Sequence, residues 1–241
     1  MTMKIILLVA FSIFACTLSA PAQETAMQKA DKLYAERDKV ENLRQAVALV
    51  EKEVTNYEAM WRLSKFKYYL ADHESDKEQR NRVLQAGIAA AERAVKIEPN
   101  RVEGHFWLGA NKGEYADMKG GFAALGLVKT VRKEFETALS LDPTYAKGST
   151  HLALGQMLIE MPKLLGGSDK KGLEYLEGGL KFGPQNAELK LYLAQQYARK
   201  DRKDEAKRLL AEVLKEDDPL RTPNEQGELR AKAQQLLDKL K

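Results

Sequence analysis

Cysteine is almost absent from this chain of 241 residues, and the one that occurs, Cys16, stands near the N-terminus. A single cysteine cannot form an internal disulfide, and it cannot supply a set of thiolate ligands to a metal. Residues 1–22 are interpreted below as a leader whose removal would take Cys16 with it. The mature chain is therefore expected to be stabilised by packing alone.

Residues that usually carry catalysis are also scarce. The only three histidines are His73, His105 and His151, and no two of them stand three or four residues apart, as metal ligands on one helix face would. The chain contains no H-E-x-x-H, G-x-x-x-x-G-K-[ST], G-x-G-x-x-G or G-x-S-x-G motif. The sequence therefore predicts a protein that is not an enzyme, with no catalytic residue, no metal and no cofactor.

A strong charge of one sign is missing as well. Lys and Arg number 39 against 35 Asp and Glu, and the small excess is spread along the chain. This balance is too even to indicate a nucleic-acid-binding surface. Charged residues make up 31% of the chain and aromatic residues 7%, which is typical of helices with well-solvated outer faces.

The only apolar run of note lies at the N-terminus. Lys4 precedes residues 5–16, a run too short to span a bilayer as a helix, and Ala20-Pro21-Ala22 follows it as an A-x-A cleavage site. We therefore predict a signal peptide over 1–22 and one exported domain over 23–241. Two alternatives remain open, a buried N-terminal helix and lipid anchoring through Cys16, since Ile13-Phe14-Ala15-Cys16 resembles a lipobox with a poorly fitting Phe14.

Three segments repeat the same spacing of four, three and five residues. They are Gly87, Ala91, Ala94 and Pro99, then Val131, Phe135, Ala138 and Pro143, then Gly172, Leu176, Gly179 and Pro184. Steps of four and three keep side chains on one helix face, and a proline ends the helix. This pattern resembles the tetratricopeptide repeat, a helical hairpin with small residues where its two helices cross.

The repeats predict an all-α, tetratricopeptide-like α-solenoid of about five helical hairpins plus a C-terminal helix. Asn56, Asp76 and Thr222-Pro223 are expected to start helices. Small residues such as Gly87 and Gly179 are expected to let paired helices approach closely. The predicted helices cover 24–37, 40–54, 57–71, 77–97, 102–116, 127–141, 146–160, 169–182, 187–200, 203–216 and 224–240.

Two predicted loops, 118–127 and 161–167, are apolar where loops are normally polar. Insertions in a solenoid gather on one edge, which is often the working edge. The side chains of these loops could pack locally, or they could bind a partner protein. On the second interpretation the partner-binding residues are Phe122, Leu125, Leu164 and Leu165.

The first helix of each hairpin lines the concave side of such an array. Counting from each repeat proline predicts an inner wall that is aromatic and has few charges, suited to an apolar ligand or helix. The alternative is that these rings only fill the seams between hairpins. The predicted ligand-binding residues are Trp61, Phe106, Trp107, His151, Leu154 and Tyr192.

Residues 104–109, 119–121 and 161–167 together resemble the T-component family of TRAP transporters, which is itself similar to the regulators of microtubule dynamics. The resemblance implies a periplasmic helical protein that binds a TRAP substrate-binding subunit, handles apolar small molecules and could self-associate. It carries no catalytic residue. The alternative is a tetratricopeptide adaptor for envelope protein assembly with no small ligand.

Overall fold

The computed structural model describes residues 24–240, apart from the side chains of residues 121–123. The predicted leader, with Cys16, lies outside the described residues. Within them the chain forms eleven α-helices and two short 3-10 helices, and no strand. In order these are α1 (Ala26–Ala35), α2 (Val40–Val50), α3 (Tyr57–Asp72), α4 (Lys77–Ile97), α5 (Val102–Lys119), α6 (Gly121–Leu141), η1 (Tyr145–Gly148), α7 (Ser149–Glu160), η2 (Lys163–Leu165), α8 (Asp169–Gly179), α9 (Ala187–Arg199), α10 (Lys203–Lys215) and α11 (Pro223–Lys239).

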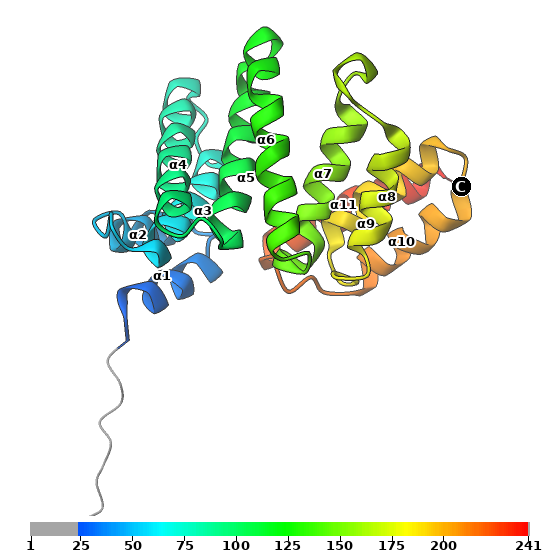
Figure 1. Ribbon diagram of the computed structural model, residues 1–241. Coiled ribbons are helices and arrows are strands. Elements are labelled where there is room, and N and C mark those ends of the chain that lie inside the picture. Colours follow the sequence, from blue (N-terminus) through cyan, green and yellow to red (C-terminus); the bar gives the residue numbers. More distant parts are fainter. Residues whose placement is uncertain (1–23, 241) are drawn as a thin grey trace, which may run out of the picture.

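Consecutive helices pack as hairpins, α1 with α2 through α9 with α10, and the hairpins follow one another along a curved ribbon (Figure 1). The last helix, α11, packs against both α9 and α10. The predicted fold of about five hairpins plus a C-terminal helix is therefore confirmed, because each hairpin buries its apolar face against the next.

The predicted helix starts are confirmed by their caps. The side chain of Asn56 accepts hydrogen bonds from the first turn of α3, and that of Asp76 accepts one from the first turn of α4. Thr222 and Glu225 form a reciprocal capping box at the start of α11, where Pro223 takes the first helical position. Such caps satisfy backbone N–H groups that have no partner inside the helix.

Small residues occupy the crossings, as predicted. A Cβ atom added to Gly87 would lie 2.2 Å from Oδ1 of Asn111, and one added to Gly179 would lie 2.8 Å from Cβ of His151. A Cβ on Gly172 would lie 2.8 Å from the carbonyl oxygen of Gly155. Real Cβ contacts are longer than this, so only glycine allows these helices to pack at the observed separation.

One loop prediction is wrong. Residues 118–127 do not form an apolar loop, because α5 continues to Lys119 and α6 begins at Gly121. The two helices are separated by Gly120, which has φ 63° and ψ 178°. The alanine and leucine residues after it are good helix formers, and one glycine with positive φ is enough to turn the chain. Residues 161–167, in contrast, do connect two helices, with η2 inside them.

The buried apolar side chains form three clusters in sequence along the ribbon. The first joins α1–α4 around Leu43 and Phe66, the second joins α3, α5, α6 and α7 around Phe106 and Phe135, and the third joins α7–α11 around Leu193. Each cluster spans neighbouring hairpins, as expected for a solenoid in which repeats contact only their neighbours.

Candidate binding cavity

A cavity of about 1060 Å³ lies among the first helices of the hairpins. Its wall is built mainly by α1, α3, α5, α6 and α7, together with residues 219–221 and the first turns of α11. The cavity therefore collects side chains from both ends of the chain, far apart in sequence.

One wall is apolar and comes from α5 and α6. Phe106 contacts Trp107 edge-on with ring centroids 5.0 Å apart, and it contacts Phe135 at 5.8 Å. The indole Nε1 of Trp107 donates a hydrogen bond to the hydroxyl of Tyr145 at 3.1 Å. This bond satisfies the only polar atom of the indole, so Trp107 is held in place with its ring on the cavity wall.

The neighbouring wall, from α3, mixes rings with charge. Trp61, Tyr68 and Tyr69 line it, and the rings of Tyr68 and Tyr69 lie 5.7 and 6.1 Å from that of Trp107. Burial raises the pKa of Tyr68, so its hydroxyl stays protonated and neutral. Tyr68, Tyr69, Trp107 and Phe106 form a continuous set of ring contacts, and Trp61 lines the same cavity.

A lysine lies within the α3 wall. The ammonium of Lys65 is 3.7 Å from the centroid of the Tyr34 ring, and within residues 24–240 no carboxylate forms an ion pair with it. Burial lowers the pKa of Lys65 to about 8, with Arg37 and Arg62 adding to the effect and Asp31 opposing it. Lys65 thus places a half-buried cationic group in an otherwise aromatic wall.

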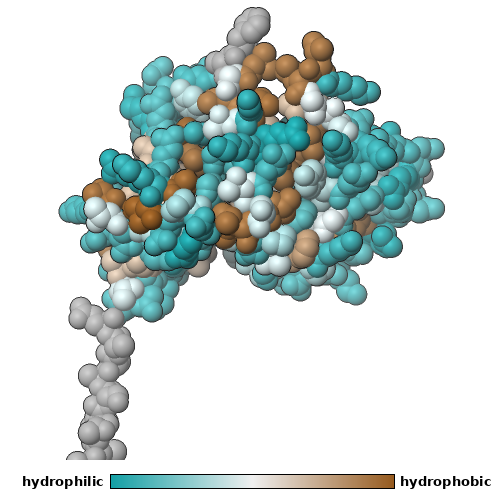
Figure 2. Space-filling view, in the orientation of Figure 1, coloured by the Kyte–Doolittle hydropathy of each residue, from teal (hydrophilic) through white to brown (hydrophobic). Residues whose placement is uncertain are grey.

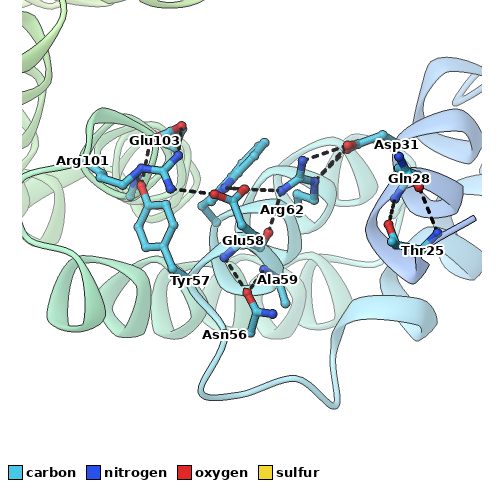
Figure 3. A network of polar contacts seen from close by, with 12 residues as sticks. Thr25, Gln28, Asp31, Asn56, Tyr57, Glu58, Ala59, Arg62, Arg101 and Glu103 are labelled. Atoms are coloured by element: carbon cyan, nitrogen blue, oxygen red, sulfur yellow. Dashed lines mark hydrogen bonds and ion pairs between the residues drawn. The ribbon is translucent and has the colours of Figure 1, made fainter.

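Figure 3 shows the polar network that holds α1, α3 and α5 together at the start of α3. Arg62 binds Asp31 of α1 and Glu58, and Arg101 joins Glu58 to Glu103 of α5. Burial alone would raise the pKa of Glu58, but hydrogen bonds from Arg62, Trp61 and Arg101 lower it. The network holds α1, α3 and α5, which carry the aromatic wall, in fixed positions relative to one another.

The remaining wall is ionic, and this corrects the prediction of a groove with few charges. Arg37 pairs with Glu225, and Arg221 pairs with Glu188. Counting from the repeat prolines does not find Arg37, Arg221 and Glu225, because they come from a loop and from the C-terminal segment, outside the repeated pattern; Glu188 lies in the first turn of α9. In the sequence only Thr222-Pro223 marks this segment, and it predicts the start of a helix without showing where that helix packs.

The structure brings together only some of the predicted ligand-binding residues. Trp61, Phe106 and Trp107 line the cavity. Leu154 is buried in the same apolar cluster as Phe106 and Trp107 and does not line it. His151 and Tyr192 do not line it either. The six residues therefore do not share one surface.

His151 points into the seam between α7 and α8. Its ring lies 5.1 Å from that of Phe182, and burial lowers its pKa. The cause is a change of register, because α5 begins three residues after Pro99 whereas α7 begins at Ser149, six residues after Pro143. The three additional residues between the proline and the helix are accommodated by Ala146, Lys147 and Gly148, which have positive φ. They turn the chain so that α7 presents a different face to the cavity. Cavity positions on α7 are instead Ser149, Leu152, Ala153, Gln156, Met157 and Glu160.

Tyr192 lies on α9, where another element covers the inner side. Leu229 and Ala233 of α11 pack in the same apolar cluster as Leu193 of α9. The hydroxyl of Tyr192 donates a hydrogen bond to Glu160 at 3.0 Å. Because α11 occupies this part of the concave side, Glu188 is the only residue of α9 that lines the cavity.

The predicted partner-binding residues lie at the tips of two neighbouring hairpins. Leu164 is 96% exposed, and Leu125 and Leu165 are each 42% exposed. Figure 1 places the α5–α6 and α7–α8 tips on one edge, and Figure 2 shows apolar residues gathered there. Leu125 and Leu165 also line the cavity, so this edge borders it. The side chain of Phe122 lies outside the described residues.

Within residues 24–240 no three His, Cys, Asp or Glu side chains are grouped to hold a metal ion. No helix in the same range has the length and apolar character needed to cross a bilayer.

These features define a tetratricopeptide-like helical scaffold with a partly open cavity on its concave side. Residues 26–164, more than half of the chain, match the family described as Regulator of microtubule dynamics protein 1-3. The chain belongs to this family. The match ends within η2, so it includes the aromatic wall, the α5–α6 tip and part of the α7–α8 tip, while Leu165, Glu188 and residues 219–232 of the cavity wall lie beyond it. No curated protein matches the chain.

Solved structures share the fold at low sequence identity. The thermophilic TPR protein TTC0263 of Thermus thermophilus is 18% identical, with a TM-score of 0.64 over 88% of this chain and 97% of that one. MamA (41-end) from Desulfovibrio magneticus RS-1 is 14% identical, with a TM-score of 0.50 over 80% of this chain and 96% of that one. At these identities the similarity concerns the fold alone.

Proposed function

We propose that the protein is an exported, non-enzymatic binding protein that holds an apolar small molecule in its internal cavity. The observation that carries this proposal is the convergence of Trp61, Phe106 and Trp107 on one cavity of about 1060 Å³. Small-molecule sites are typically concave, largely apolar and roughly 300–1,000 Å³ in volume. The cavity has this size and an aromatic wall.

The number of rings matters for affinity. One ring that buries ~150–250 Å² gains at most about 4–6 kcal/mol at ~25 cal/mol/Å². Association itself costs on the order of 4–15 kcal/mol, so one ring cannot hold a ligand alone. Phe106 and Trp107 are only 7% and 6% exposed, so each has little area left to bury, and a ligand would have to contact the α3–α5 wall as a whole.

The proposed setting is the bacterial periplasm, with a TRAP substrate-binding subunit as the partner. The leader-like residues 1–22 and the resemblance to the TRAP T-component family support this setting. Because Leu125 and Leu165 are exposed and also line the cavity, a partner docked on the hairpin tips would lie beside the bound molecule. Transfer between the two proteins would then need no passage through bulk water.

Native mass spectrometry of protein purified from its own envelope tests the proposal. We expect a co-purifying apolar molecule that is lost in Trp107→Ala and retained in Tyr192→Ala, which removes a ring outside the cavity. The purified protein should also bind the apolar fluorophore N-phenyl-1-naphthylamine with the same pattern. No bound molecule and no fluorophore binding in the wild type would refute the proposal.

A second candidate is a tetratricopeptide adaptor for envelope assembly that has no small ligand. The exposure of Leu125, Leu164 and Leu165 on one edge favours it, because contiguous exposed apolar residues mark contact sites. Leu164→Asp should then abolish capture of a specific envelope protein. Val54→Asp is the matched control, since Val54 is also exposed, at 46%, in the α2–α3 loop.

A further inference from the structure

The two ends of the solenoid meet through a buried arginine. Arg37, in the loop between α1 and α2, is only 4% exposed. Its Nε and Nη2 donate to the two carboxylate oxygens of Glu225 at 2.8 and 2.5 Å, and Nη2 also donates to the carbonyl oxygen of Leu220 at 2.8 Å. This two-pronged geometry is the strongest that a guanidinium forms with a carboxylate.

The next residue holds the same helix end. Asp38 accepts hydrogen bonds from the hydroxyl of Thr222 and from the backbone N–H of Asn224. Two consecutive residues of one loop therefore grip the first turn of α11. We call this contact, formed by Arg37 and Asp38 with residues 220–225, the clasp.

The clasp is also part of the cavity wall. Arg37, Leu220 and Glu225 line the cavity, and the guanidinium of Arg37 lies 4.4 and 4.8 Å from the ring centroids of Tyr34 and Tyr69. Tyr34 and Tyr69 line the cavity as well. Any separation of the two ends would therefore remove one side of the cavity.

The clasp differs in chemistry from the seams between hairpins. The apolar cluster around Leu43 and Phe66 contains helices α1–α4, and that around Leu193 contains α7–α11, with no residue in common. In the described residues the clasp thus joins two clusters by polar groups. When the clasp opens, water can replace its hydrogen bonds, whereas nothing replaces the buried apolar contacts of a hairpin seam. The clasp therefore opens at a lower free-energy cost than any hairpin seam.

We propose that the clasp is a gate: when Arg37 and Asp38 release α11, the ends of the ribbon separate and the cavity, which is already partly open to solvent, widens to admit ligand. This inference rests on the proposed binding function for its purpose, although the opening itself does not depend on a ligand. The unit that moves is the block α7–α11, because Leu229 and Ala233 of α11 share one apolar cluster with Leu152 of α7 and Leu176 of α8.

Cross-linking the clasp tests the gate. Cys16 is the only native cysteine, so Cys16→Ser with Asp38→Cys and Thr222→Cys leaves two thiols, which a short bifunctional thiol reagent can join across the clasp. With N-phenyl-1-naphthylamine as the probe, we expect cross-linking to slow association and dissociation at least tenfold. Glu41→Cys with Gln45→Cys, two neighbouring positions of α2, is the control for the chemistry and should leave both rates unchanged. Unchanged rates in the cross-linked clasp would overturn the proposal.

A readout without ligand separates this inference from the proposed function. Glu225→Gln removes the charge of the clasp carboxylate while keeping its shape, and Arg37→Ala removes the guanidinium. If the gate exists, both should raise hydrogen exchange at the amides of residues 222–226 and increase the radius of gyration in solution scattering, with helix content kept. If neither the wild type nor any variant binds the probe, the proposed function fails, but hydrogen exchange and scattering still show whether the gate exists. Exchange and scattering equal to wild type in Glu225→Gln would reject the gate.

Discussion

Hairpins α5–α6 and α7–α8 carry the same proline-linked spacing, yet they are closed in different ways. In α5–α6 the ring of Phe135 covers Gly109, where an added Cβ would lie 2.9 Å from the ring. In α7–α8 backbone meets backbone, since a Cβ on Gly148 would lie 2.6 Å from the carbonyl oxygen of Gly179. In the first seam an aromatic side chain covers the glycine, whereas the second combines Leu176 over Gly155 with direct contact between glycine backbones.

Each hairpin also buries one histidine, in opposite circumstances. His105 of α5 bonds to the carboxylate of Glu134 at 2.7 Å and to the carbonyl oxygen of Pro99 at 2.9 Å. His151 of α7 has a buried Nδ1 with no hydrogen-bond partner in the described chain. The comparison shows that a spacing of small residues specifies that two helices pair, but not which groups fill the seam between them.

The largest expected effect comes from overfilling the matching position in the neighbouring hairpin α3–α4. Ala94 holds the place in its repeat that Gly179 holds in α8, and it is fully buried. Ala94→Trp should lower the free energy of unfolding by roughly 1–3 kcal/mol, toward the upper end because an indole must enter a closed seam. Urea unfolding followed by circular dichroism measures it.

Gly179→Leu tests the glycine seam of α7–α8 directly. The added side chain meets Cβ of His151 at 2.8 Å and Cδ2 of Leu189 at 3.1 Å, and we expect a loss of about 1–3 kcal/mol. Gly178→Leu is the adjacent control, because its Cβ has only one neighbour, an atom of His151 at an ordinary 3.8 Å. Equal melting temperatures for the two variants would show that the register of α8 is wrong.

The two histidines predict opposite pH dependence. The hydrogen bond to Glu134 raises the pKa of His105, so its stabilisation is fully present below pH ~6.5 and is lost as pH rises through the folded pKa. Burial lowers the pKa of His151, so stability falls as pH drops below ~6.5.

Unfolding at pH 5.5 and pH 8.5 separates the two cases. His105→Ala should cost more at pH 5.5 than at pH 8.5, by about 1 kcal/mol, the typical net value of one hydrogen bond. His151→Ala should cost less at pH 5.5, because the variant no longer has a buried imidazole that must stay neutral. If the cost of both substitutions changed in the same direction between pH 5.5 and pH 8.5, the contrast between the two seams would be contradicted.

The smallest expected effect is a gain. Gly227 lies inside α11, and a Cβ there would meet no atom within 4 Å, so no close approach requires this glycine. Gly227→Ala should raise the free energy of unfolding by about 0.5–1 kcal/mol through helix propensity alone. A loss of stability in a thermal melt would mean that α11 packs more tightly than described.

Local signals predicted most of the fold. Asn56, Asp76 and Thr222 marked helix starts, and the repeat spacing placed Gly87 and Gly179 at crossings, because capping and steric contact within a hairpin depend on residues close in sequence. The prediction of an apolar loop at 118–127 is wrong. The pair Gly120-Gly121 indicates a break between two helices but does not show how long the connection is.

The candidate site was predictable only in part. Phe106 and Trp107 were placed correctly because α5 follows Pro99 as the repeat expects. His151 and Tyr192 were not, because three left-handed residues rotate α7 and α11 covers α9. Neither event leaves a periodic signal in the sequence.

The sequence by itself determined that this chain is a series of helical hairpins, since periodicity, caps and prolines act over a few residues. Only the tertiary structure decided that the ribbon closes on itself through Arg37 and Glu225, which stand 188 residues apart. The summed curvature of five hairpins sets that meeting, and a rotation at any one seam, such as that before α7, displaces the distant end.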